Sequence, residues 1–143
     1  MNIHQISVFL ENRSGQLAEI TRLLADANVD IRALSIAETA DYGLARMIVD
    51  DSAKASSILL QHGDILSMTP VWAVEVPDRP GGLAEMLGVL AENHVDVEYM
   101  YSLFTHKEGN AYMVLRISDE PTFLNALGTK RIKIMTKEEL QLK

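Results

Sequence analysis

The fold is decided by Asp78-Arg79-Pro80-Gly81-Gly82-Leu83 and by an earlier counterpart of this stretch, Asn12-Arg13-Ser14-Gly15-Gln16-Leu17. In both places a run of β-branched and aromatic residues gives way to a turn that contains glycine. An amphipathic helical pattern then follows directly. A turn at the start of a helix leaves backbone N–H groups without acceptors, which makes it suited to binding an anion. Two such turns in one short chain indicate binding rather than catalysis.

The two stretches are 66 residues apart, and the same offset aligns much of the chain without a gap. Leu17-Ala18-Glu19 aligns with Leu83-Ala84-Glu85, and Val29-Asp30 aligns with Val95-Asp96. Further along, the aligned pairs are Thr39 with Thr105, Gly43 with Gly109, Ala45 with Ala111, and Met47 with Met113. The chain is therefore an internal repeat of two copies.

The composition excludes several classes of function. The chain has 143 residues, 48% of them hydrophobic, with a formal net charge of −7 and no cysteine. An acidic chain without a Lys/Arg cluster is a poor partner for nucleic acid or anionic lipid. No apolar run is long enough to span a membrane, and the first residues do not form a secretion signal. The histidines lack metal-ligand spacing. We expect a cytoplasmic protein with no metal, no cofactor and no membrane contact.

Each copy shows the same order of predicted elements. The first copy has strands at 3–10, 29–37, 44–49 and 65–68, and helices at 13–28 and from Asp51-Ser52 to 60. The second has strands at 71–76, 95–104, 111–117 and 132–135, and helices that begin at Pro80 and after Asp119. The order is βαββαβ, which predicts an α+β protein with two tandem ferredoxin-like domains and antiparallel sheets. Only Thr69-Pro70 separates the copies, so we expect domains at 1–69 and 70–143 that pack as one body.

The glycine turns have the chemistry to bind an amino acid. Backbone N–H groups around Gly15 or Gly81 can receive a carboxylate, because glycine has no side chain to keep a ligand away from the backbone. Asn12 or Asp78 can accept a hydrogen bond from an ammonium group. The alternative is that each glycine only permits a tight turn and that Asn12 or Asp78 only caps the helix.

The βαββαβ order, the Asp-Arg-Pro-Gly-Gly-Leu turn and the pairs Asn28-Val29-Asp30-Ile31 and His94-Val95-Asp96-Val97 resemble ACT domains, small regulatory modules that bind amino acids. The resemblance implies ligand sites between paired domains, where the turn of one domain meets the helix-to-strand junction of its neighbour. The implied ligand-binding residues are Asn12, Arg13, Ser14, Gly15, Gln16, Leu17, Asn28 and Val29 in the first copy, and Asp78, Arg79, Pro80, Gly81, Gly82, Leu83, His94 and Val95 in the second. The first copy departs from the pattern at Ser14 and Gln16, so we expect the two sites to differ.

The sequence thus predicts a non-catalytic regulatory module that binds a free amino acid, forms a homodimer and acts on a protein partner in trans. The apolar run Tyr99-Met100-Tyr101-Ser102-Leu103-Phe104 motivates the dimer. Two alternatives remain open at this point. One is a small acylphosphatase-like hydrolase, with an arginine in the first turn and Asn28 placing water. The other is a purely structural dimerisation module. The identity of the amino acid and of the regulated partner is not encoded in any pattern that we can read.

Overall fold

The computed structural model describes residues 2–11, 13–38 and 41–143 of the chain. They form two compact units. The N-terminal unit contains the described residues within 4–69 together with 141–143, and the C-terminal unit contains residues 70–140 with 2–3. The domain boundary expected between residues 69 and 70 stays a prediction.

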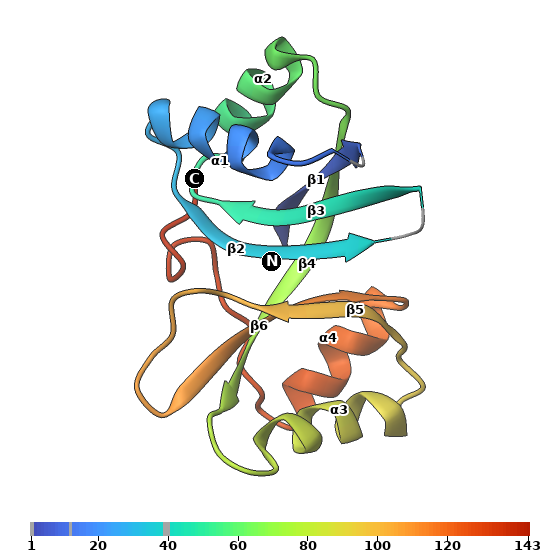
Figure 1. Ribbon diagram of the computed structural model, residues 1–143. Coiled ribbons are helices and arrows are strands. Elements are labelled where there is room, and N and C mark those ends of the chain that lie inside the picture. Colours follow the sequence, from blue (N-terminus) through green and yellow to red (C-terminus); the bar gives the residue numbers. More distant parts are fainter. Residues whose placement is uncertain (1, 12, 39–40) are drawn as a thin grey trace. The chain divides into compact units, whose positions relative to one another are not determined.

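The N-terminal unit is an antiparallel sheet with two helices on one face (Figure 1). Its elements are β1 (Ile3–Glu11), α1 (Gln16–Asp26), β2 (Ile31–Glu38), β3 (Tyr42–Val49), α2 (Ser52–His62) and the start of β4 (Leu66–Pro77), and the strand order is β2-β3-β1-β4. Alternate residues of β1 (Ile6, Val8 and Leu10) point toward the helices and pack against Ile20, Leu24 and Leu59. Asp51 caps α2 by accepting a hydrogen bond from the Lys54 N–H at 3.1 Å, as expected from sequence.

The C-terminal unit repeats this plan (Figure 1). It contains the remainder of β4, α3 (Gly82–Glu92), β5 (Val97–Ser102), β6 (Asn110–Ile117) and α4 (Glu120–Thr129), with β6 between β4 and β5. Its closing strand is reduced to one antiparallel bridge between Ile134 and Val74. The core packs Trp72 against Phe123 with ring centroids 5.8 Å apart. The predicted α+β fold of two ferredoxin-like repeats is therefore confirmed.

One expectation about the repeat is wrong. The ungapped offset of 66 holds as far as β2 and β5, but Tyr42–Val49 corresponds to Asn110–Ile117, an offset of 68. Ile31 pairs with Val49 and Val97 pairs with Ile117, so the second hairpin is longer by two residues. A two-residue shift keeps every side chain on its own face of the sheet, which is why the sequence pattern conceals it. The helix caps Asp51 and Asp119 obey the offset of 68 as well.

One further expectation needs correction. The run from Leu66 to Pro77 is one continuous strand, not two strands separated at Thr69-Pro70. The C-terminal tail ends in a hydrogen bond from the Lys143 N–H to the Asp50 carbonyl oxygen at 2.8 Å.

Candidate functional site

Each glycine turn forms the start of a helix. Gly15 and Gly81 are the N-cap residues of α1 and α3, with φ of 85° and 87°, a left-handed conformation that glycine adopts without strain. Neither helix has a side-chain cap, so Asp78 does not cap α3 as the alternative reading of the turn required. The same question for Asn12 lies outside the described residues. Open space surrounds the position that a side chain at Gly81 would occupy.

The start of α3 leaves backbone donors unused. The Glu85 N–H donates to the Gly81 carbonyl oxygen at 2.9 Å, and the Gly82 N–H donates to the Arg79 carbonyl oxygen at 3.0 Å. Helix geometry gives the next two N–H groups, of Leu83 and Ala84, no acceptor within α3. These donors carry the positive end of the helix dipole.

The predicted junction residues lie at the other end of each helix. Asn28 and His94 are both left-handed, with φ of 60° and 57°, and they end α1 and α3 in the same way. The N–H groups of Val29 and Val95 donate to the carbonyl oxygens of Leu24 and Leu90, both at 2.9 Å. Within a unit the turn and the junction are thus separated by a helix of 11 residues, about 16 Å long. The hydrolase alternative needs Arg13 and Asn28 together, and the N-terminal unit keeps them apart.

A hollow lies beside each turn. The first hollow, about 240 Å³, is lined by residues that include Phe9, Glu11, Gln16, Glu19, His62 and Asp64. The second hollow, about 280 Å³, is lined by residues that include Glu75, Pro77, Gly82, Met86, Arg131 and Lys133. The offsets of 66 and 68 make these positions structural equivalents, so the two hollows are the same place in the two repeats.

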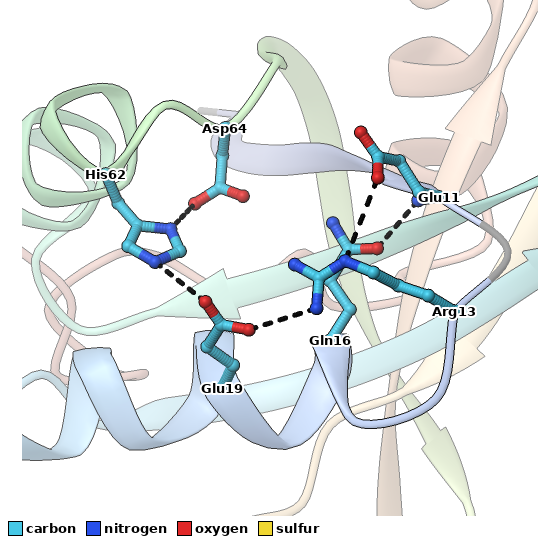
Figure 2. A network of polar contacts seen from close by, with 6 residues as sticks. All are labelled: Glu11, Arg13, Gln16, Glu19, His62 and Asp64. Atoms are coloured by element: carbon cyan, nitrogen blue, oxygen red, sulfur yellow. Dashed lines mark hydrogen bonds and ion pairs between the residues drawn. The ribbon is translucent and has the colours of Figure 1, made fainter.

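In the first hollow the side chains bind one another (Figure 2). Arg13 Nη1 lies 3.2 Å from Glu19 Oε2, and Arg13 Nε lies 3.7 Å from Glu11 Oε2. His62 Nε2 lies 3.0 Å from Glu19 Oε1, and its Nδ1 lies 2.8 Å from Asp64 Oδ2. The hydrogen bond to Asp64 is the main cause that raises the pKa of His62 above its ordinary value, and Glu19 adds to it. Every charged group drawn in Figure 2 therefore has a partner within the hollow.

The two turns differ in whether the last residue of the preceding strand has a backbone N–H that needs a hydrogen-bond acceptor. In the N-terminal unit the Glu11 N–H donates to Gln16 Oε1 at 2.7 Å, and Gln16 is buried. In the C-terminal unit Pro77 stands in the place of Glu11, and because proline has no N–H, no acceptor is needed. The place of the buried Gln16 is taken by Gly82, which is also buried. A Cβ at Gly82 would lie 2.0 Å from the Pro77 carbonyl oxygen, so this turn accepts only glycine.

The second hollow has a different set of charges. Arg79 pairs with Glu85 at 3.2 Å, and Lys133 pairs with Glu139, which raises the pKa of Lys133 and lowers that of Glu139. Arg131 has no ion pair or side-chain hydrogen bond with any residue that the structure describes. Asp78, the predicted ammonium acceptor, is not among the lining residues, whereas Glu75 is.

Sequence reasoning found the turns but missed the residues opposite them. His62 ends α2 and Asp64 follows it, and Arg131 and Lys133 follow α4, about 50 residues after the glycines that they face. No motif marks them. The signal was in the topology, because the order β2-β3-β1-β4 places the start of the last strand beside the end of the first strand.

Two features are absent from the part of the chain that the structure describes. Among these residues there is no cluster of histidine, aspartate and glutamate that could hold a metal ion. None of their helices has the length and apolar character needed to cross a membrane.

Comparison with known proteins identifies the family. A family model described as an ACT domain pair matches residues 1–141. The chain belongs to the ACT domain pair family. The sequence-based resemblance is thus confirmed, and the fold agrees with it. A search of curated proteins found no significant match to the sequence.

Solved structures show the same ACT domain pair fold. A crystal structure of a Bacteroides thetaiotaomicron protein is 38% identical, with 99% of this chain and 96% of that chain covered and a TM-score of 0.91. The ligand-free regulatory subunit of aspartate kinase from Thermus thermophilus is 15% identical over 88% of this chain and 90% of that one, with a TM-score of 0.65. Aspartate kinase from Synechocystis is 20% identical over 90% of this chain and 24% of that one, with a TM-score of 0.57. The last two likenesses concern the fold alone.

Proposed function

We propose that this ACT domain pair is a non-catalytic regulatory module that binds a free amino acid at its glycine turns. The observation that carries the proposal is the turn at Gly81, which begins α3 in a left-handed conformation with open space where a side chain would stand. A ligand carboxylate can approach this backbone more closely than it could approach any other residue type. Membership of the family supports the same reading.

The local chemistry suits the carboxylate of an amino acid. The spare N–H groups of Leu83 and Ala84 lie at the positive end of α3, where the helix dipole stabilises an anion by about 0.3–1 kcal/mol. Gly15 offers the same conformation at α1, but beside it the first hollow is occupied by its own paired charges. We therefore assign the stronger site to the C-terminal unit.

Regulation requires that ligand binding change how the chain interacts with another protein molecule. Our proposal includes pairing with a second copy of the chain, which the apolar run from Tyr99 to Phe104 motivates, and an effect on a partner protein in trans. A ligand shifts such an assembly only when it binds one of its states more tightly than the other. Residues Asn28, Val29, His94 and Val95 are the proposed contribution of the helix-to-strand junctions to sites between paired domains.

A thermal unfolding scan with each of the twenty amino acids tests the proposal. A ligand at about 100 times its Kd stabilises the folded protein by roughly 2.7 kcal/mol, which raises the midpoint by several degrees. Acetyl phosphate in a parallel sample tests the hydrolase alternative by its disappearance. If no amino acid shifts the midpoint at millimolar concentration, the proposal fails and a purely structural module becomes the better account.

A further inference from the structure

We infer that the second hollow selects a zwitterionic amino acid with an uncharged apolar side chain, using Arg131 for the carboxylate and Glu75 for the ammonium. This inference rests on the proposed function and adds to it the ligand class and the residues that recognise it. It also assigns the site to one unit of the two. The first hollow, with the same backbone plan, supplies the internal reference.

The two hollows differ in their balance of charges. In the first hollow three carboxylates, of Glu11, Glu19 and Asp64, face one arginine and a histidine. At the equivalent positions of the C-terminal unit, Glu11 and Asp64 are replaced by the uncharged Pro77 and Ile132. The second hollow also gains cations where the first has none, because Gly63 corresponds to Arg131 and Ile65 to Lys133. It also gains a carboxylate, since Phe9 corresponds to Glu75, so its two cations face Glu75 and Glu85, whereas carboxylates outnumber cations in the first hollow. A ligand carboxylate is therefore repelled less by the second hollow than by the first.

Arg131 is the cation available for a ligand. Lys133 is already held by Glu139, and Arg79 is held by Glu85. Arg131 has no such partner within the described residues, although it lines the hollow and carries five N–H donors in a planar fork that matches a carboxylate. It also stands where the N-terminal unit has glycine: Gly63 has φ of 95° and Arg131 has φ of 56°. An arginine at a left-handed position is a strained choice for a helix end, and a ligand contact gives a reason for it.

The remaining lining completes the match to an amino acid. Glu75 is the carboxylate available for an ammonium group, because its side chain has no ion pair or hydrogen bond with any described residue, whereas Glu85 is ion-paired with Arg79. Its equivalent in the first hollow is Phe9, which stacks on Tyr42 with centroids 5.1 Å apart. Met86 and Ile132 give the second hollow an apolar wall. One cation, one anion and an apolar wall fit a zwitterion whose side chain carries no charge.

Titration calorimetry with three related probes tests the recognition of both charges. The probes are leucine, leucinamide, which lacks the carboxylate, and N-acetylleucine, which lacks the ammonium. We expect leucine to bind and both derivatives to bind at least about 10-fold more weakly, since each leaves a charged group without its partner. Glutamate and lysine, each with a charged side chain against the apolar wall, should also bind more weakly than leucine. Tighter binding of either would overturn the assignment of an apolar ligand.

The variant Arg131→Asn locates the site. Asparagine tolerates the left-handed backbone, so the fold should persist, while leucine affinity should fall about 10- to 100-fold. The difference between leucine and leucinamide should vanish with the charge. Gln141→Asn, at another left-handed position with φ of 58°, is the matched control and should bind as the wild type does. If an amino acid binds Arg131→Asn unchanged, this inference is wrong while the proposed function stands. If no amino acid binds the wild type, both fall.

Discussion

The first and second hollows occupy the same place in two copies of one fold, yet their side chains do different things. In the N-terminal unit Arg13, Glu19, His62 and Asp64 bind one another across the hollow (Figure 2). In the C-terminal unit Gly82 stands in the place of Gln16, and Arg131 lines the hollow without an ion pair or side-chain hydrogen bond among the described residues. A duplicated fold thus keeps its backbone plan while one copy pairs the charges of its hollow and the other leaves Arg131 without an ion pair among the described residues. The difference rests on a few positions, so single substitutions can test it.

The largest expected effect is on stability at Gly82. Gly82→Ala places a Cβ 2.0 Å from the Pro77 carbonyl oxygen, so the backbone of the turn must shift. We expect the free energy of unfolding to fall by about 3 kcal/mol, measured by urea denaturation. Gly88→Ala is the control, because its Cβ meets nothing within 4 Å and the change favours a helix; it should raise stability by up to about 1 kcal/mol. Equal effects of the two variants would refute the steric explanation of the second turn.

The next effect concerns the counterpart of Gly82. Gln16→Ala removes the acceptor of the Glu11 N–H, and Gln16 is only 7% exposed. The loss of an acceptor for this partly buried donor should cost about 1–2 kcal/mol in the same denaturation assay.

A double-mutant cycle sharpens this comparison. Glu11→Pro copies Pro77 and removes the N–H itself, so adding Gln16→Ala to it should cost clearly less than Gln16→Ala alone. If the two changes are additive, the hydrogen bond is not the reason why the N-terminal unit has glutamine where the C-terminal unit has glycine.

The smallest effect is the pH dependence from His62. Its pKa is raised in the folded protein, chiefly by Asp64, so protonated His62 stabilises the fold at pH values below its unfolded pKa of about 6.5. That contribution is lost as the pH rises through the higher pKa of the folded state. The stability difference between wild type and His62→Gln should therefore be larger at about pH 6 than at about pH 8.5.

The matched control for His62 is His4→Gln, which changes an exposed histidine on β1. It should change stability less than His62→Gln does at about pH 6, because the His4 side chain has no ion pair with any described residue. A His62→Gln difference that does not change with pH would show that the ion pairs in Figure 2 do not form in solution.

Much of the fold could be predicted from the sequence because the signals were local. Alternating apolar residues in β1, the caps Asp51 and Asp119 and the two glycine turns each determine structure within a few residues of themselves. The greater length of the second hairpin was not predicted, because a shift of two residues preserves the alternation of inward-facing and outward-facing side chains. Chance identities such as Gly43 with Gly109 and Met47 with Met113 then supported the wrong alignment.

The site was predictable only on its turn side. Gly81 and Gly82 are recognisable because a left-handed cap and a close backbone approach need glycine. Arg131 and Lys133 are ordinary surface residue types, and only the sheet order brings them to the same hollow as Glu75. With the ungapped offset Arg131 aligned with Ile65, which hid its correspondence to the left-handed Gly63. The correct register was needed before the contrast between the two hollows could be seen.

The most direct test of the account is the number of amino acid molecules bound per chain, measured by titration calorimetry with the amino acid that gives the largest thermal shift. We predict one bound molecule per chain. Gly81→Val should abolish binding, because its side chain blocks the approach to the α3 turn, whereas Gly15→Val should retain it; circular dichroism first confirms that both variants fold. Two molecules per chain, or a greater loss from Gly15→Val than from Gly81→Val, would contradict the assignment of the site to the C-terminal unit.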